Sequence, residues 1–194
     1  MKLVPEALQR LIGRRLVDID TPALVVDLDA LSRNVQRMAE FASRHRLRWR
    51  PHAKTHKSCE IALFQMQAGA IGICVQKTSE AEIMAEGGIR DIYISNQVVG
   101  PEKLQRVARL AMQLAAERGR LAIAVDHAEG VTRLAQALRE AGAGPNTLDV
   151  LVEIDVGQTR CGVVPGAPAV ALAKAVMEHP AMRFAGVQAY HGKA

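Results

Sequence analysis

Aromatic side chains are scarce in this sequence of 194 residues, which has one tryptophan, two tyrosines and three phenylalanines. The formal net charge of +5 would by itself fit a nucleic-acid partner. Proteins that bind single strands place aromatic rings among the basic side chains, and this chain has too few rings for such a surface. We therefore expect no nucleic-acid binding, and the mild basicity instead suits an enzyme with anionic substrates.

The chain also lacks the signatures of disulfide-rich, zinc-binding and membrane proteins. Its three cysteines, Cys59, Cys74 and Cys161, are odd in number and form no CxxC pair, which argues against a disulfide framework or a structural zinc site. Residues 1–17 mix apolar residues with charges and Pro5, unlike a signal peptide, and no apolar run is long enough to span a membrane. These absences predict a cytoplasmic protein without a membrane partner.

Short apolar runs alternate with longer amphipathic segments over most of the chain. The short runs are rich in β-branched residues, as strands are, and the longer segments have the apolar spacing of helices. The pattern predicts strands at 21–29, 47–53, 72–76, 91–96, 121–125, 150–156 and 184–189. It predicts an amphipathic opening helix before residue 21 and further helices at 30–45, 58–68, 79–86, 101–118, 128–141 and 167–178.

Strands that return after each helix form βα units and a parallel sheet. Two α/β architectures share this alternation, the (β/α) barrel and the doubly wound open sheet. The sequence contains neither the GxGxxG loop nor the P-loop of nucleotide-binding open sheets. Composition thus favours the barrel only slightly, and a complete barrel typically needs roughly 250 residues, more than this chain has.

One predicted strand has an unusual basic face. Five basic residues alternate with apolar ones, so that in a strand they all point the same way: Arg46, Arg48, Arg50, His52 and Lys54. One interpretation is an exposed edge strand with a solvated face. The other places this face in the barrel lumen, with Lys54 at the carboxyl end of the strand, where barrel enzymes carry their catalytic groups.

The predicted strand at 150–156 carries the opposite charge. Glu153 and Asp155 alternate there with apolar residues. Because buried charges need compensation, we expect one of these carboxylates to pair with the basic face around Arg50. The alternative is that both lie at the strand end in water.

Five segments in order along the chain carry the most distinctive residues. They are RPHAKTHK at 50–57, GICVQKTSEAEIM at 72–84, DIYISNQVVGPEKL at 91–104, VLVEIDVGQTRCGV at 150–163 and FAGVQAYHG at 184–192. Together they resemble the D-threonine aldolase and D-serine dehydratase family of alanine-racemase-like, fold type III pyridoxal-phosphate enzymes. The resemblance implies an α/β fold: the N-terminal (β/α)8 TIM-type barrel of that family, truncated after about six barrel strands.

The resemblance also implies a set of cofactor-binding residues. Lys54 is similar to the lysine that binds pyridoxal 5'-phosphate covalently, and Lys57, three residues on, is its competitor. Arg160 resembles an arginine near the phenolic oxygen of the cofactor; otherwise it is an arginine of a surface loop.

Three further positions follow strands and resemble residues that face the cofactor. Tyr190 and His191 are similar to a pair near the pyridine ring and the phosphate, although residues at strand ends also serve packing. Gln76 lies at the carboxyl end of a predicted strand, a position from which it would face the cofactor, and Asn96, which is similarly placed, ranks below it.

The chain departs from the family in its length. We expect residues 1–20 to form an N-terminal helical extension and residues 21–194 an incomplete barrel, without the C-terminal β domain of the family. That domain holds the divalent metal (zinc, manganese or magnesium), so no metal ligand is assigned here. In the family the strand at 21–29 joins that domain and would here lack its partners. The open barrel edge would favour association, including a homodimer.

The resemblance implies a pyridoxal-phosphate-dependent lyase acting on D-3-hydroxy amino acids, of the D-threonine aldolase or D-serine and D-hydroxyaspartate dehydratase type. The activity of the truncated chain itself is left open. One alternative is a non-catalytic barrel that binds the cofactor or serves as an interaction module. Another is an amino-acid racemase, which would need a second acid-base residue on the opposite face.

Overall fold

Residues 6–192 are described by a computed structural model. Contacts divide the chain into two units, residues 1–38 and residues 39–194. The first unit contains helix α1 (Glu6–Gln9), a 3-10 helix (Leu16–Asp18) and the start of helix α2 (Leu28–Arg44), which crosses the boundary. The amphipathic opening helix expected before residue 21 is reduced, over the residues described, to the single turn of α1 and the 3-10 helix. The separate status of residues 1–20 stays a prediction.

The strand expected at 21–29 is also wrong. Residues 21–27 are irregular, and α2 begins at Leu28. Leu24 is 92% exposed and Val25 is 59% exposed, so the apolar side chains of this stretch lie in water. A strand requires a neighbour that pairs with its backbone groups, and β propensity alone does not supply one.

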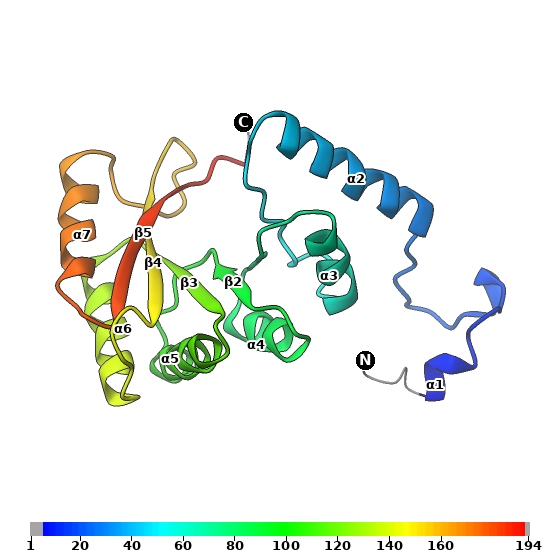
Figure 1. Ribbon diagram of the computed structural model, residues 1–194, viewed down its shortest axis with the longest axis horizontal. Helices are drawn as coiled ribbons and strands as arrows, with labels where there is room; N and C mark the ends of the chain where they lie inside the picture. The colour runs from blue at the N-terminus through cyan, green and yellow to red at the C-terminus, as the bar shows by residue number, and fades with distance from the viewer. Residues whose placement is uncertain (1–5, 193–194) are drawn as a thin grey trace. The chain divides into compact units, whose positions relative to one another are not determined.

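The second unit is built on a five-stranded, wholly parallel sheet in which the strands follow one another in chain order (Figure 1). Each neighbouring pair is in parallel register, and the register of β4 with β5 shifts between Val150 and Leu151. The strands are β1 (Ile73–Val75), β2 (Asp91–Ile94), β3 (Arg120–Val125), β4 (Leu148–Ile154) and β5 (Met182–Ala189). Consecutive parallel neighbours joined by helices confirm the α/β fold and the partial barrel.

Five helices connect or precede these strands. They are α3 (Cys59–Gln67), α4 (Thr78–Glu86), α5 (Pro101–Ala116), α6 (Ala128–Glu140) and α7 (Ala167–Met177). Helices α4, α5 and α7 contact the sheet, and α6 packs between α5 and α7 (Figure 1). The hydrophobic core lies between these helices and one face of the sheet. No helix among residues 6–192 is long and apolar enough to cross a membrane.

The segment expected as a strand at 47–53 runs beside β1 without forming a regular strand. The N–H of Ile71 donates to the carbonyl of Trp49 (3.0 Å), and the N–H of Cys74 donates to that of Pro51 (2.8 Å). Only His52 forms a bridge with β1, opposite Cys74. Pro51 has no N–H to donate, which interrupts a regular ladder. The expected position beside the sheet is thus confirmed, whereas the regular strand is not.

Candidate functional site

A cavity of about 430 Å³ opens over the polar face of the sheet, and residues at the carboxyl ends of several strands line it. In parallel α/β folds this edge is where ligands usually bind. The cavity brings together residues from segments far apart in the sequence, including Lys54, Gln76, Asn96, Arg160 and Tyr190. Four of the five residues expected to bind a cofactor therefore share one cavity, and only His191 is not among the lining residues.

Lys54 occupies this cavity because the backbone on both sides of it is anchored. The N–H of Ala53 donates to the carbonyl of Cys74 on β1 (2.8 Å), and the N–H of Lys54 donates to Nδ1 of His52 (3.2 Å). The Lys54 side chain is exposed toward the cavity. The competing Lys57 is not among the lining residues, and its Nζ lies 3.9 Å from a carboxylate oxygen of Glu80.

His52 lies beside Lys54 and makes two polar contacts. Its Nδ1 accepts the hydrogen bond from the backbone of Lys54, so in the neutral ring the proton is on Nε2, which lies 3.3 Å from Oγ of Ser95. Burial, followed by the charge of Lys54, lowers the pKa of His52 below its ordinary value. The neutral imidazole is thus favoured next to the lysine.

Arg160 and Tyr190 meet across the cavity, thirty residues apart in sequence. The guanidinium carbon of Arg160 lies 4.5 Å from the centre of the Tyr190 ring, which is a cation–π contact. Asp155 shapes the intervening loop, because its carboxylate accepts the N–H groups of Gly157 (2.9 Å) and Thr159 (3.0 Å). These hydrogen bonds lower the pKa of Asp155, and the one from Thr159 has the largest effect.

The expected pairing of Arg50 with Glu153 or Asp155 is wrong. Nη2 of Arg50 lies 2.8 Å from the carboxylate of Asp91, and Nη1 donates to the Asp91 carbonyl (3.2 Å). The Arg50 guanidinium therefore bonds at the amino end of β2, whereas Glu153 and Asp155 lie at the carboxyl end of β4. The Glu153 carboxylate instead accepts a hydrogen bond from Gln97.

Several cavity residues on β1, β2 and β5 escaped the sequence reasoning. The Tyr93 hydroxyl donates to the side-chain oxygen of Gln188, whose amide nitrogen donates to the carbonyl of Ser95 (3.3 Å). Burial, followed by the neighbouring Cys74 and Glu153, raises the pKa of Tyr93. The alternation in the segment DIYIS places Asp91, Tyr93 and Ser95 on one face of a strand. This pattern could have identified Tyr93 and Ser95 as cavity residues.

Glu80 connects two parts of the site from outside the cavity. It is 7% exposed, and its Oε2 accepts the N–H groups of Gln76 (2.9 Å) and Lys77 (3.3 Å) at the start of α4. Its other oxygen faces Lys57, which belongs to the Lys54 loop. A single buried carboxylate therefore holds the end of β1 and lies next to the lysine-bearing segment.

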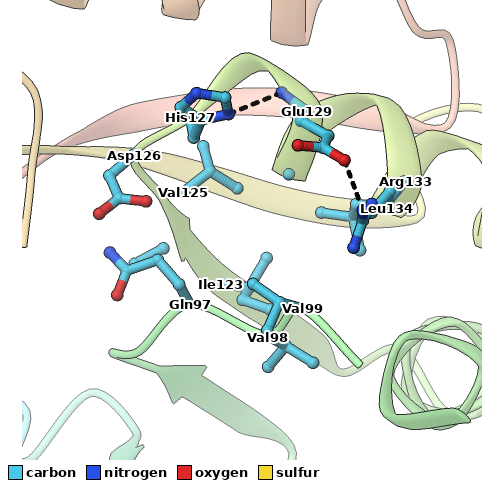
Figure 2. A pocket seen from close by; sticks show the side chains of 12 residues that line it. Gln97, Val98, Val99, Ile123, Val125, Asp126, His127, Glu129, Arg133 and Leu134 are labelled. Atoms are coloured by element: carbon cyan, nitrogen blue, oxygen red, sulfur yellow. Dashed lines mark hydrogen bonds and ion pairs between the residues drawn. The ribbon is translucent and has the colours of Figure 1, made fainter. Parts of the chain in front are cut away.

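A second cavity, of about 160 Å³, lies between the loop after β2 and the start of α6 (Figure 2). Its polar side chains are largely satisfied by neighbours. Nδ1 of His127 accepts the N–H of Glu129 (3.1 Å), the Glu129 carboxylate pairs with Arg133, and Asp126 accepts the N–H of Gly162 (3.1 Å). This cavity contains no lysine, so it is a weaker candidate for chemistry on a carbonyl compound.

Within residues 6–192, no cluster of three or more histidine, cysteine, aspartate or glutamate side chains could hold a metal ion. The expected metal ligands outside this chain stay a prediction.

Comparisons with known proteins agree with this geometry. The family model of the alanine racemase N-terminal domain matches residues 26–194. The chain is 47% identical over 180 residues to a D-threonine aldolase of an Arthrobacter species, and the match covers 93% of this chain and 45% of the relative. It is 40% identical over 177 residues to a 3-hydroxy-D-aspartate aldolase of Paracoccus denitrificans, and this match covers 91% of this chain and 44% of the relative.

Among solved structures, the D-threonine aldolase of Filomicrobium marinum superposes with a TM-score of 0.83 at 50% identity. The match covers 91% of this chain and 46% of that structure, so the chain spans a little under half the length of the relatives it matches. With 169 consecutive residues matched to one family model, from residue 26 to residue 194, this chain belongs to the alanine racemase N-terminal domain family.

Proposed function

We propose that this chain is the cofactor-binding part of a pyridoxal-phosphate-dependent lyase that acts on D-3-hydroxy amino acids. The observation that carries the proposal is one cavity shared by a lysine, an arginine and a tyrosine, namely Lys54, Arg160 and Tyr190. The names of the relatives, D-threonine aldolase and 3-hydroxy-D-aspartate aldolase, support the substrate class.

The residues of the cavity fit pyridoxal phosphate in size and in chemistry. A volume of about 430 Å³ falls within the range of roughly 300–1,000 Å³ typical of cofactor and ligand pockets. Lys54 offers a primary amine for covalent attachment, and Arg160 offers a cation for the ionised phenolic oxygen. Of the candidate residues, His191 has the weakest support, because it is not among the residues lining the cavity.

Each residue of this chain has a defined task in the proposal. Lys54 would hold the cofactor and take or release a proton at its Nζ when the substrate amine replaces it. Tyr190 would orient Arg160 through the cation–π contact, and Gln76 would line the same cavity. Pyridoxal phosphate, when bound, supplies an electron sink for bond breaking at the substrate α-carbon.

Covalent trapping tests the assignment of Lys54. The 194-residue chain is incubated with pyridoxal phosphate near stoichiometric concentration, reduced with borohydride, digested and examined by mass spectrometry. We expect one label per chain, on Lys54, and its loss in Lys54→Arg with retention in Lys57→Arg. A label on Lys57, or one scattered over exposed lysines, would contradict the proposal.

Turnover assays separate the lyase from a non-catalytic cofactor-binding barrel. D-threonine, D-serine and D-3-hydroxyaspartate are offered to a longer protein that contains this chain, and the release of aldehyde or keto acid is followed. Product formation that requires Lys54 supports the lyase, and labelling of Lys54 without any product supports the non-catalytic alternative. Repeating the assay with a chelator tests the proposed divalent metal, whose removal we expect to reduce turnover.

A further inference from the structure

We infer that the chain has a second, anion-binding site beside the Lys54 cavity, suited to a phosphate group. A separate cavity of about 310 Å³ lies between the N-terminal ends of α4 and α5. It shares Gln76 and Asn96 with the Lys54 cavity but contains neither Lys54 nor Arg160. The two cavities are therefore neighbours on the functional face of the sheet, with different charged groups.

The charges around this cavity all have the same sign. Lys77, Lys103 and Arg106 line it, and no carboxylate side chain is among its lining residues. Arg106 pairs with Glu82 through Nε and Nη2, whereas Lys77 and Lys103 make no ion pair within the described part of the chain. Two positive charges thus remain to be balanced by a ligand or by solvent ions.

The backbone adds further hydrogen-bond donors. Helix α4 begins at Thr78 and α5 begins at Pro101, and the first N–H groups of a helix have no partner within it, although Pro101 itself has no N–H. At α4 the Glu80 carboxylate accepts the N–H groups of Gln76 and Lys77, which precede the helix. It therefore leaves the N–H groups of Thr78 and Ser79 available to an anion, which the positive end of the helix dipole also attracts.

A buried hydroxyl provides independent support for a ligand. Thr78 lines the cavity and is only 3% exposed, yet its Oγ1 has no hydrogen-bond partner among the described residues. An unsatisfied buried hydroxyl is costly, so such groups usually have a partner that completes them. A phosphate oxygen would accept this hydroxyl together with the N–H groups of the helix and the two lysines.

Phosphate titration followed by nuclear magnetic resonance tests the site. The 194-residue chain is titrated with inorganic phosphate at pH 7 and constant ionic strength, and the backbone amide signals of Thr78, Ser79 and Lys103 are recorded. We expect saturable shifts of these signals. The double variant Lys77→Gln, Lys103→Gln should weaken binding at least roughly tenfold, because it removes two charge-assisted contacts.

Matched variants distinguish a specific phosphate-binding site from a general effect of the net positive charge. Arg139→Gln with Lys174→Gln also removes two exposed positive charges, on α6 and α7, and should leave the affinity unchanged. Thr78→Val should weaken binding, and Thr78→Ser, which keeps the hydroxyl, should restore it. Equal weakening by both double variants, or wild-type affinity in both the lysine double variant and Thr78→Val, overturns the inference.

The location and the ligand class are tested in the same way. Shifts confined to amides around Arg160 and Tyr190 would mean that phosphate binds only in the Lys54 cavity, and would overturn the second site. Arg160→Gln should leave the shifts at Thr78 unchanged. Malonate is a control for a dicarboxylate ligand, and tighter binding of malonate than of phosphate would contradict the phosphate assignment.

Discussion

The two faces of the parallel sheet differ in composition although the same strands form both. On the helix-covered face, Ile73, Ile92, Ile123 and Val150 are fully buried in an apolar core. The intervening side chains on the other face are mostly polar, as Tyr93 and Glu153 illustrate. The first face stabilises the fold by removing apolar surface from water, and the second must satisfy each polar group with a partner.

The polar face also differs along the strands. At their amino ends it carries ion pairs: Arg50 with Asp91, and Arg120 and Arg183 with Asp149. At their carboxyl ends it carries Lys54 and the cavity. In barrels, residues at the amino ends of the strands typically serve stability, and those at the carboxyl ends serve function. Variants on the two faces should therefore differ in size of effect and in kind.

The largest effect is expected on the apolar face. Ile123→Ala should lower the free energy of unfolding by about 3 kcal/mol, because it leaves a cavity at a site that is 1% exposed. Urea denaturation followed by circular dichroism measures the change. Ser95→Ala, on the polar face of the neighbouring β2 end, should cost less than half as much. If the two costs were equal, the contrast between the faces would be wrong.

A smaller loss is expected from the ion pairs of the polar face. Asp149 is 2% exposed and bonds to Arg120 and Arg183, whose side chains are 41% and 52% exposed. Asp149→Asn should cost about 1–2 kcal/mol, less than a fully buried pair because both arginines are partly hydrated. Denaturation in urea at low and high salt checks this, with Arg183→Met as a partner variant. A stabilised Asp149→Asn protein would contradict the role of the pairs.

Glu80 should affect the site as well as stability. Glu80→Ala removes the acceptor of two backbone N–H groups and should cost about 1 kcal/mol, whereas Glu80→Gln keeps one acceptor oxygen and should cost less. The yield of borohydride-trapped label on Lys54 should fall in the same order. An unchanged yield in both variants would show that Glu80 does not position the lysine loop.

The smallest effect concerns pH. Burial lowers the pKa of His52 and of His56 below the ordinary value of 6.5. The unfolded chain then binds protons at a higher pH than the folded one, so stability is retained above about pH 6.5 and lost as pH falls toward the lowered folded values. Lys54 and Glu80 also act on His52, in opposite directions.

Thermal unfolding between pH 7.5 and pH 5 measures this dependence. His52→Asn should flatten the decrease, because asparagine can accept the Lys54 N–H without titrating. A decrease that is as steep in both His52→Asn and His56→Asn as in the unchanged protein would place its origin in other groups.

The apolar face was the more predictable of the two. Helix α5, expected at 101–118, spans Pro101–Ala116, and strand β4, expected at 150–156, spans Leu148–Ile154. Such limits follow from the local spacing of apolar residues. The polar face was less predictable, because the partner of Arg50 depends on which strand lies within reach. The glycine at position 72 was the local sign that Arg50 lies there, because a side chain at this position would clash with the Arg50 guanidinium.

The sequence by itself determined the order of helices and strands, the period of two that puts Lys54 on the basic face, and the resemblance that points to a cofactor. Only the tertiary structure decided that residues 21–27 stay irregular, that Asp91 is the partner of Arg50, and that Arg160 meets Tyr190. The physical reason is that secondary structure follows local periodicity, whereas pairing depends on distances across the sheet between segments far apart in the chain.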